Sequence, residues 1–252
     1  MIACHQISCN RTAYKSVIPF PTPFSFSFHA IMLTLLITAI LFFSLNLSAE
    51  SQKNGDHNQV LVERSAKIVS TLGITDSVKY NKVVYELVNQ YEQLNLIHDQ
   101  SKANIADIKK QTLSDDEKAA AIKTQEGKKS AELLKLHDQF IAGLQKDLTN
   151  EQIDKIKDGM TYRVFPITYA AYNDMLTNLT PAQKDKIYNW LKEARELAMD
   201  EGSSDDKHKV FGKYKGRINN YLSAEGYDLK KETADWQARI KERDTQKKNI
   251  QN

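Results

Sequence analysis

Residues 159–175, GMTYRVFPITYAAYNDM, combine aromatic rings with a cation at close spacing. The segment contains Tyr162, Arg163, Tyr169 and Tyr172. Tyrosine rings can stack on a sugar ring or a peptide, and a neighbouring guanidinium can pair with an anionic group of the same ligand. The alternative is that these rings pack into the core with their hydroxyl groups at its rim. We treat these residues as candidate ligand-binding residues.

Residues 205–228, DDKHKVFGKYKGRINNYLSAEGYD, form the most unusual stretch of the chain. Glycine and asparagine cost up to about 1 kcal/mol each in a helix relative to alanine, yet the apolar residues here keep helical spacing. A surface that recognises an anion or a carbohydrate would explain this composition, because Lys and Arg donate to carboxylates and Asn amides donate and accept. Glycines that admit a neighbouring helix, with solvated basic side chains, are the alternative. The candidate binding residues are His208, Lys213, Tyr214, Arg217, Asn219 and Asn220.

Catalytic and metal-binding motifs are absent from the sequence. It contains no HExxH or CxxC spacing, no GxSxG, no P-loop and no dinucleotide fingerprint. Glu193, Glu196, Asp200 and Glu201 lie on one predicted helix, where a solvated face accounts for them. We therefore predict no catalytic residue, no metal site and no cofactor.

His98 and His137 are each followed by Asp and Gln and are the histidines most open to a metal-binding interpretation. In an antiparallel hairpin that turns near residue 112, they are about 10 residues out of register, or about 15 Å along the helix axis. One metal ion cannot bridge that separation. We expect each histidine to hydrogen-bond locally, supported by Asp99 or Asp138.

Three similar pentapeptides, LSDDE, LTNEQ and LTPAQ, indicate where helices begin. Ser or Thr followed three residues later by Glu or Gln is a capping box, in which each side chain bonds the backbone amide of the other residue. The pentapeptides are therefore structural and carry no function of their own. The predicted capping pairs are Ser114–Glu117, Thr149–Gln152 and Thr180–Gln183.

Apolar residues recur every three or four positions along the chain, and no alternating run of strand length appears. We predict an all-α fold, a helical bundle of about seven to eight helices built on a long antiparallel hairpin. Gly127 predicts a fray or kink in the hairpin, and Pro166 predicts a loop over residues 160–165. Apolar stripes mark Leu61–Leu72 and Ala119–Leu144, and further helices are expected at about 76–110, 150–159, 166–176, 181–200, 204–224 and 229–245. In the helix over 181–200, the predicted apolar stripe is Ile187, Trp190, Leu191, Ala194 and Leu197.

The first 49 residues differ in composition from the rest. Ala30–Leu47 is an 18-residue, mostly apolar run that follows Arg11 and Lys15. This order is typical of a cleaved secretory signal peptide, here residues 1–49, with an uncleaved anchor as the alternative. Met32 is an alternative start.

We expect a single all-α domain over residues 50–245 and a frayed tail over 246–252. Both cysteines, Cys4 and Cys9, precede the apolar run, which excludes disulfides and a thiol nucleophile from the exported part. The exported part carries 33 basic and 32 acidic residues, which is no nucleic-acid footprint.

Residues 159–229 resemble an exported bacterial family known as domain of unknown function 3826, most specifically at FGKYKGRINNYL. AKIVSTLGITD, QYEQLNLIHDQ and LHDQF, earlier in the chain, are also similar to it. The resemblance implies an exported, sugar-binding protein of bacteria that degrade polysaccharides, and it supplies no catalytic residue to carry over. Leu148–Gln152 and Leu179–Gln183 alone give a weaker likeness to periplasmic helical chaperones marked by LTxxQ repeats.

These observations favour an exported, non-enzymatic protein of the periplasm or cell exterior that binds carbohydrate, including acidic glycans. A periplasmic chaperone-like or envelope structural protein, using the long hairpin as a partner surface, is the alternative. An enzyme acting on polysaccharide fragments is less favoured, because it would need two carboxylates facing each other across a cleft. We expect no membrane span after signal cleavage, and the sequence leaves the oligomeric state open.

Overall fold

The computed structural model describes residues 58–251, all within the unit Asp56–Asn252. The predicted signal peptide, residues 1–49, lies outside the described residues. Over the described range the chain is all-α and contains no strand, as predicted. A helix over residues 58–69 continues into the 3-10 turn η1 (Ser70–Leu72), and seven helices follow. They are α2 (Ser77–Lys110), α3 (Asp115–Leu144), α4 (Asn150–Met160), α5 (Val164–Met175), α6 (Pro181–Met199), α7 (Ser204–Ala224) and α8 (Leu229–Gln251).

The pentapeptides begin helices, as predicted. In each capping box the hydroxyl accepts from the amide three residues on, and that residue's side chain accepts from the capping residue's own amide. Pro181 occupies the first position of α6, where its missing amide has no intrahelical partner to lose. The observed boxes are those at Ser114–Glu117, Thr149–Gln152 and Thr180–Gln183.

Three local predictions need correction. Helix α3 runs without a break through Gly127. Helix α5 begins at Val164, so Phe165 is helical and only Thr161–Arg163 separate α4 from α5. Pro166 is tolerated because it lies in the first turn of α5, where amides lack intrahelical partners. Helix α8 continues to Gln251, beyond the end predicted near residue 245.

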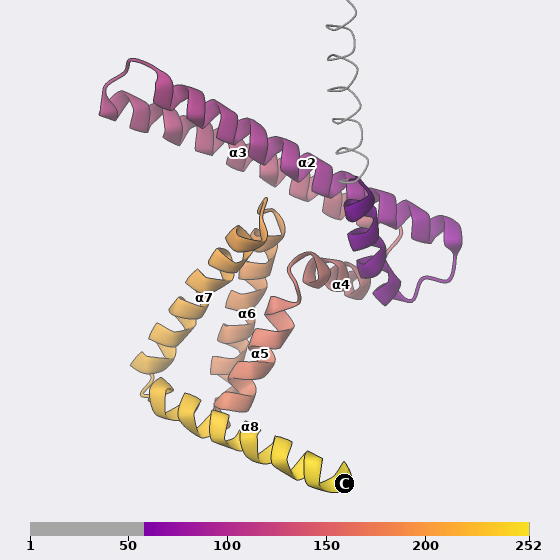
Figure 1. Cartoon of the computed structure of the whole chain (residues 1–252), viewed down its shortest axis with the longest axis vertical. Coiled ribbons are helices and arrows are strands. Elements are labelled where there is room, and N and C mark those ends of the chain that lie inside the picture. The colour runs from indigo at the N-terminus through magenta and orange to yellow at the C-terminus, as the bar shows by residue number, and fades with distance from the viewer. Residues whose placement is uncertain (1–57, 252) are drawn as a thin grey trace, which may run out of the picture. The chain divides into compact units, whose positions relative to one another are not determined.

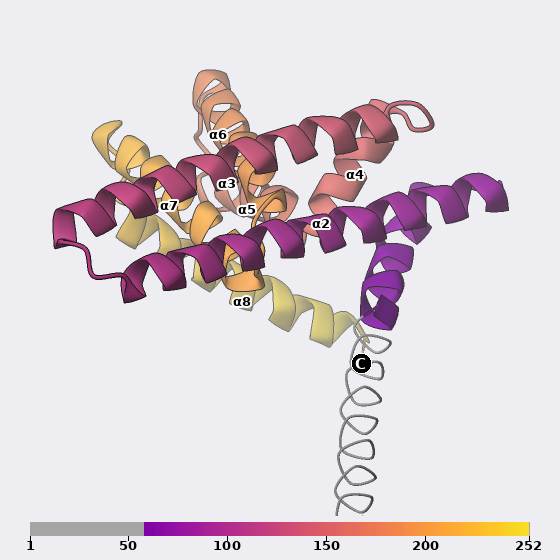
Figure 2. The ribbon, with the colours of Figure 1, turned by 90° about the horizontal axis from the view of Figure 1, so that it is seen from above.

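Helices α2 and α3 form the predicted antiparallel hairpin, and Figure 2 shows them side by side. The hairpin packs with the helix over 58–69 and with α4 around a first core. That core contains Leu61, Val69, Val83, Leu87, Leu94, Leu144, Ile156 and, from the end of α6, Met199. Further toward the hairpin turn, no residue between 102 and 139 is buried.

Helices α5, α6 and α7 pack side by side, and α8 lies across the ends of α5 and α7 (Figure 1). Their second core contains Phe165, Leu176, Ile187, Leu191, Ala194, Ala198, Phe211, Ile218 and Leu222. The stripe predicted for α6 was wrong at Leu197, which is 52% exposed. Arg195 and Ala198 take the buried positions instead.

Two glycines set the distance between helices by lacking a side chain. A Cβ atom built on Gly159 would lie 2.7 Å from Ile68, so the helix over 58–69 approaches the end of α4 closely. A Cβ atom on Gly202 would lie 2.7 Å from the ring of His98, which brings the loop after α6 against α2. The contact between Ile68 and Gly159 joins two elements that line a pocket.

Candidate ligand-binding site

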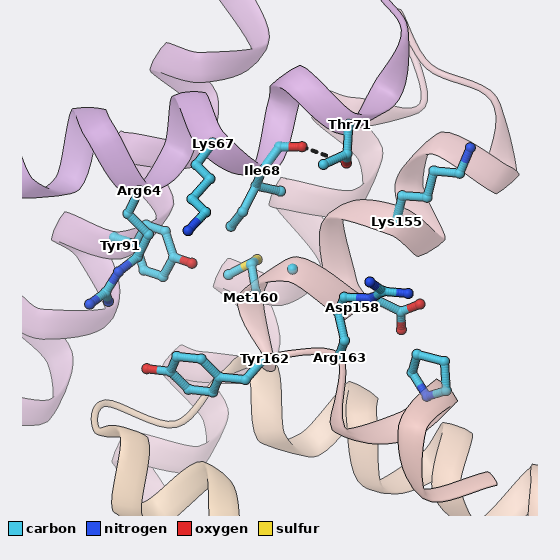
Figure 3. Close-up of a pocket in the computed structure, with 12 residues that line it drawn as sticks. Arg64, Lys67, Ile68, Thr71, Tyr91, Lys155, Asp158, Met160, Tyr162 and Arg163 are labelled. Atoms are coloured by element: carbon cyan, nitrogen blue, oxygen red, sulfur yellow. Dashed lines mark hydrogen bonds between the residues drawn. The ribbon is translucent and has the colours of Figure 1, made fainter. Parts of the chain in front are cut away.

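A pocket of about 840 Å³ lies between the helix over 58–69, α2, the end of α4 and the start of α5. Figure 3 shows Lys67 extending into this space from one side and Tyr162 lying on the other. The volume falls within the range of about 300–1,000 Å³ that is usual for small-molecule sites. The lining residues are Arg64, Lys67, Ile68, Thr71, Tyr91, Lys155, Asp158, Gly159, Met160, Tyr162, Arg163 and Pro166.

Helical spacing places the cations of the first wall. Arg64, Lys67 and Thr71 follow at intervals of three and four, beside the buried stripe of Leu61, Ser65 and Ile68. The stripe anchors the helix to the first core, and the neighbouring row of side chains therefore faces the pocket. The contact of Ile68 with Gly159 fixes this wall against the opposite one.

The opposite wall is the turn between α4 and α5, whose backbone is strained. Tyr162 and Arg163 both have left-handed backbone conformations, with φ of 57° and 58°. For residues other than glycine this region costs roughly 1–2 kcal/mol each. The Arg163 amide donates to the carbonyl oxygen of Asp158 at 2.7 Å, which holds the turn closed. Both strained residues point side chains at the pocket, as expected where strain serves a site.

Tyrosine rings supply the aromatic part of the site. Tyr162 is 43% exposed and stacks on His208 of α7, with ring centroids 5.6 Å apart and an interplanar angle of 29°. Tyr91 is buried beneath the guanidinium of Arg64, which lies 5.7 Å from the ring centroid. Burial raises the pKa of the Tyr91 hydroxyl, so this group stays protonated and can donate a hydrogen bond.

Arg64, Lys67 and Arg163, here called the pocket cations, are exposed and form no ion pair with any described residue. Lys155, also in the lining, pairs with Glu151 at 3.0 Å. Asp158 is the carboxylate of the lining, and its Oδ1 atom accepts from Arg195 at 2.8 Å. The pocket therefore presents positive charge that the described residues do not neutralise.

Arg195 lies behind this wall and is only 2% exposed. It pairs with Asp154, Asp158 and Glu196, a group here called the Arg195 cluster. Its guanidinium also lies 5.1 Å from the ring centroid of Phe165. Burial raises the pKa of Asp158, and the hydrogen bond from Arg195 opposes that shift. The cluster joins α4 to α6 and fixes the carboxylate at the pocket wall.

The histidines bond to a partner that the sequence analysis did not predict. His98 donates from Nε2 to the carbonyl oxygen of Asp200, and His137 donates from Nδ1 to the Asp200 carboxylate, both at 2.8 Å. Asp99 and Asp138 are not these partners, because the start of the loop after α6 reaches both hairpin helices. Glu196 and Asp200 are thus part of the interior contacts, and the predicted solvated face was wrong for them.

Among residues 58–251, no group of three or more His, Cys, Asp or Glu residues is placed to hold a metal ion. In the same range no helix is long and apolar enough to cross a membrane.

The structure brings only some of the predicted site residues together. Tyr162 and Arg163 line the pocket, and His208 supports Tyr162 from behind. Tyr169 packs with Phe165 and Tyr188. These contacts with the second core match the packing alternative for Tyr169.

The remaining candidates lie away from the pocket. Tyr172 is buried and its hydroxyl donates to Asn219 Oδ1 at 2.7 Å, a bond between α5 and α7. Arg217 lies over the rings of Trp190 and Tyr214, on the α6–α7 surface. The last two, Lys213 and Asn220, are exposed on α7.

Gly212 and Gly216 do not admit a neighbouring helix. A Cβ atom on either would meet nothing within 4 Å. The close-packing alternative for this segment was therefore wrong, and the glycines face open space on α7.

Sequence reasoning missed Arg64, Lys67 and Tyr91. The available signal was the row Arg64, Lys67 and Thr71, polar residues at helical spacing next to an apolar stripe. Its meaning depends on the close approach at Gly159, which only the tertiary structure shows.

The family described as "Protein of unknown function (DUF3826)" matches residues 58–242 of this chain. No curated protein matches the sequence of this chain.

Proposed function

Since the chain belongs to the DUF3826 family of proteins of unknown function, we propose its role from its own site: an exported, non-enzymatic protein that binds carbohydrate in the pocket of Tyr162. The observation that carries this proposal is the strained turn at Tyr162 and Arg163. Glycine would fit these two backbone positions better, so the retained side chains indicate a function that needs them.

The pocket has the composition of a sugar site. The exposed face of Tyr162 offers an apolar surface for a pyranose ring. His208 stacks on Tyr162 and holds the tyrosine ring in place. The Tyr91 hydroxyl and the pocket cations supply hydrogen-bond donors for sugar oxygens. Ile68 and Met160 provide the apolar floor that usually surrounds a few polar groups in such sites.

Two further points support the proposal. The apolar run Ala30–Leu47 favours export, where polysaccharide fragments are encountered. Glycoside hydrolysis generally needs two carboxylates across a cleft, whereas the lining of this pocket contributes Asp158, which is bound to Arg195. Binding without hydrolysis therefore fits the arrangement better.

The test is titration calorimetry of the protein with oligosaccharides chosen from a glycan array. Tyr162→Gly should lower the affinity at least about tenfold, the usual effect of losing a central aromatic contact. Its melting temperature should hold or rise, because glycine relieves the left-handed strain. Tyr85→Ala, which removes a 72% exposed tyrosine on α2 outside the pocket, is the matched control and should bind normally.

Failure of every oligosaccharide to bind would contradict the proposal. Equal affinities for the wild-type protein and Tyr162→Gly would place any sugar binding elsewhere.

One observation favours a second candidate function, a chaperone-like or envelope structural role. Between residues 102 and 139 the hairpin buries no side chain, and Ile105, Ile108 and Ile122 are only half-buried. This seam could contact a partner. Suppression of aggregation of an unfolded client, abolished by Ile105→Lys together with Ile122→Lys and unaffected by Tyr162→Gly, would support this role over carbohydrate binding.

A further inference from the structure

We propose that the ligand of this pocket is an anionic glycan, whose carboxylate or sulfate groups are held by Arg64, Lys67 and Arg163. The proposal rests on the carbohydrate-binding function above and adds the charge class of the sugar. It also relocates acidic-glycan binding from the basic surface of α7 to the pocket.

The pocket cations lack ion-pair partners within residues 58–251. The chain pairs many of its charges, including exposed ones such as Lys209 with Asp206 and Lys231 with Asp235. Arg64, Lys67 and Arg163 nevertheless form no ion pair with a described residue while lining one cavity. Like charges gathered around a hollow repel one another, and a bound anion would remove that repulsion.

Asp158, at the pocket wall, is bound by a cation of the interior. A carboxylate at the wall would normally repel an anionic ligand and satisfy the nearby cations. Here Arg195 Nη1 donates to Asp158 Oδ1 at 2.8 Å from the interior side. The guanidinium also pairs with Asp154 and Glu196, so it offsets part of the charge of Asp158, and nearby Arg163 also opposes the rise that burial causes in the pKa of Asp158. Arg64 and Lys67 form no ion pair with a described residue and remain available to a ligand.

The pocket cations lie on two walls of the pocket. Arg64 and Lys67 come from the helix over 58–69, and Arg163 comes from the turn on the other side of the pocket (Figure 3). An anion on one side would reach only part of the set, so a ligand with acid groups on successive sugar rings fits best. Arginine binds carboxylate and sulfate through the same parallel N–H donors, so the geometry supports both groups.

The surface between the pocket cations is apolar. Ile68, Tyr91 and Met160 are all buried, which lowers the local dielectric constant. An ion pair formed there is stronger than one on an open surface. On α7, Lys213 is exposed, and Arg217 already lies over two rings and 3.8 Å from Glu193.

The experiment compares an oligogalacturonide with its fully methyl-esterified counterpart, which keeps the rings and linkages but carries no charge. The acid form should bind at least about tenfold more tightly, and its affinity should fall as salt is added. A sulfated neutral-sugar oligosaccharide serves as the third probe. Preferential binding of the carboxylated or the sulfated probe supports the proposal and identifies the acid group.

Lys67→Gln should weaken binding of the acid probe about tenfold and binding of the ester much less, because glutamine keeps a hydrogen-bond donor but carries no charge. Arg163→Gly should weaken it similarly while its melting temperature holds or rises, since glycine suits the left-handed position and Arg163 makes no capping bond. Loss of binding in that variant cannot then be attributed to unfolding. Lys213→Gln is the matched control and should bind both probes as the wild-type protein does.

Equal affinities for the acid and ester forms would overturn this inference and leave carbohydrate binding intact. Loss of affinity in Lys213→Gln but not in Lys67→Gln would also overturn it. If neither these probes nor neutral glycans bind, the proposed function itself fails.

Discussion

Cations gather in two neighbouring regions of this protein, and Asp158 belongs to both. On its interior side Arg195 is 2% exposed and pairs with carboxylates of α4 and α6. On its pocket side Arg64, Lys67 and Arg163 are exposed and pair with none of the described residues. Basic side chains thus stabilise the fold in the Arg195 cluster and remain free of ion pairs with described residues at the pocket.

The difference follows from the cost of desolvation. A charge that is buried loses its interactions with water, and ion pairs and hydrogen bonds with the protein must replace them. A buried cation therefore requires such partners. Lys207 of α7, which contacts the end of α6, shows the same requirement for partners. It is buried, donates to the carbonyl oxygens of Ala198 and Met199 at 3.0 Å, and burial lowers its pKa to about 8. Exposed cations carry no such requirement, and their concentration around one cavity needs another explanation.

The largest expected effect is on the buried side of this comparison. Arg195→Gln should lower the free energy of unfolding by about 3–5 kcal/mol, because it leaves Asp154, Asp158 and Glu196 without their common partner. Urea denaturation measures the change. The matched Arg64→Gln should change the free energy of unfolding by less than about 0.5 kcal/mol. Equal losses in both variants would erase the distinction between the two regions.

A smaller effect is expected where the loop after α6 meets the hairpin. Gly202→Ala should lower the free energy of unfolding by about 1–3 kcal/mol, since the added methyl group would overlap the His98 ring near its base. The same denaturation experiment tests it. A neutral outcome would mean that this loop adjusts freely and that the contact with His98 does not fix the hairpin.

His137 should give the buried side a dependence on pH. The hydrogen bond to Asp200 raises the pKa of His137 above its ordinary value of about 6.5, with burial opposing the shift. The charged form is therefore favoured in the folded state. Its contribution is complete below the unfolded pKa and is lost as pH rises through the higher folded pKa.

His137→Gln should accordingly destabilise the protein more at pH 5 than at pH 9, by less than about 2 kcal/mol, the usual range for a charged hydrogen bond. Unfolding curves of both proteins across this range measure the difference. A constant difference at every pH would show that the ring acts through packing alone.

The smallest effect should appear on the exposed surface of α7. Gly216→Ala should raise the free energy of unfolding by up to about 1 kcal/mol, because the new methyl group meets open space and alanine favours the helix. Glycan affinity should not change. Reduced affinity would restore the α7 surface as a binding site and weaken the assignment to the pocket.

Much of the fold could be predicted because its signals are local. Capping boxes at Thr149 and Thr180 and apolar stripes every three or four residues depend on neighbours within one turn. Arg195 escaped prediction because an arginine in an apolar stripe is buried only when carboxylates of another helix reach it. Its neighbour Leu197 was assigned to the core on hydrophobicity alone and proved exposed.

The candidate site was predicted only in part, because only some of its signals are local. Tyr162 and Arg163 were singled out by their composition, whereas their left-handed backbone could not be read from sequence. Arg64 and Lys67 lie about a hundred positions earlier along the chain, and a pairing over that distance has no local signature. The close-packing alternative for the α7 glycines was wrong because poor helix propensity does not show which side of a helix faces a neighbour.

The hairpin described above also bears on the order of folding. Helices α2 and α3 are consecutive, with only Gln111–Ser114 between them, so bringing them together closes a very short loop. The entropy lost in that step is small, and such pairings form early. Asp200 then reaches His98 and His137 from some sixty to a hundred residues away, so it can join only afterwards. We expect the two long helices to serve as the template on which the pocket is later assembled.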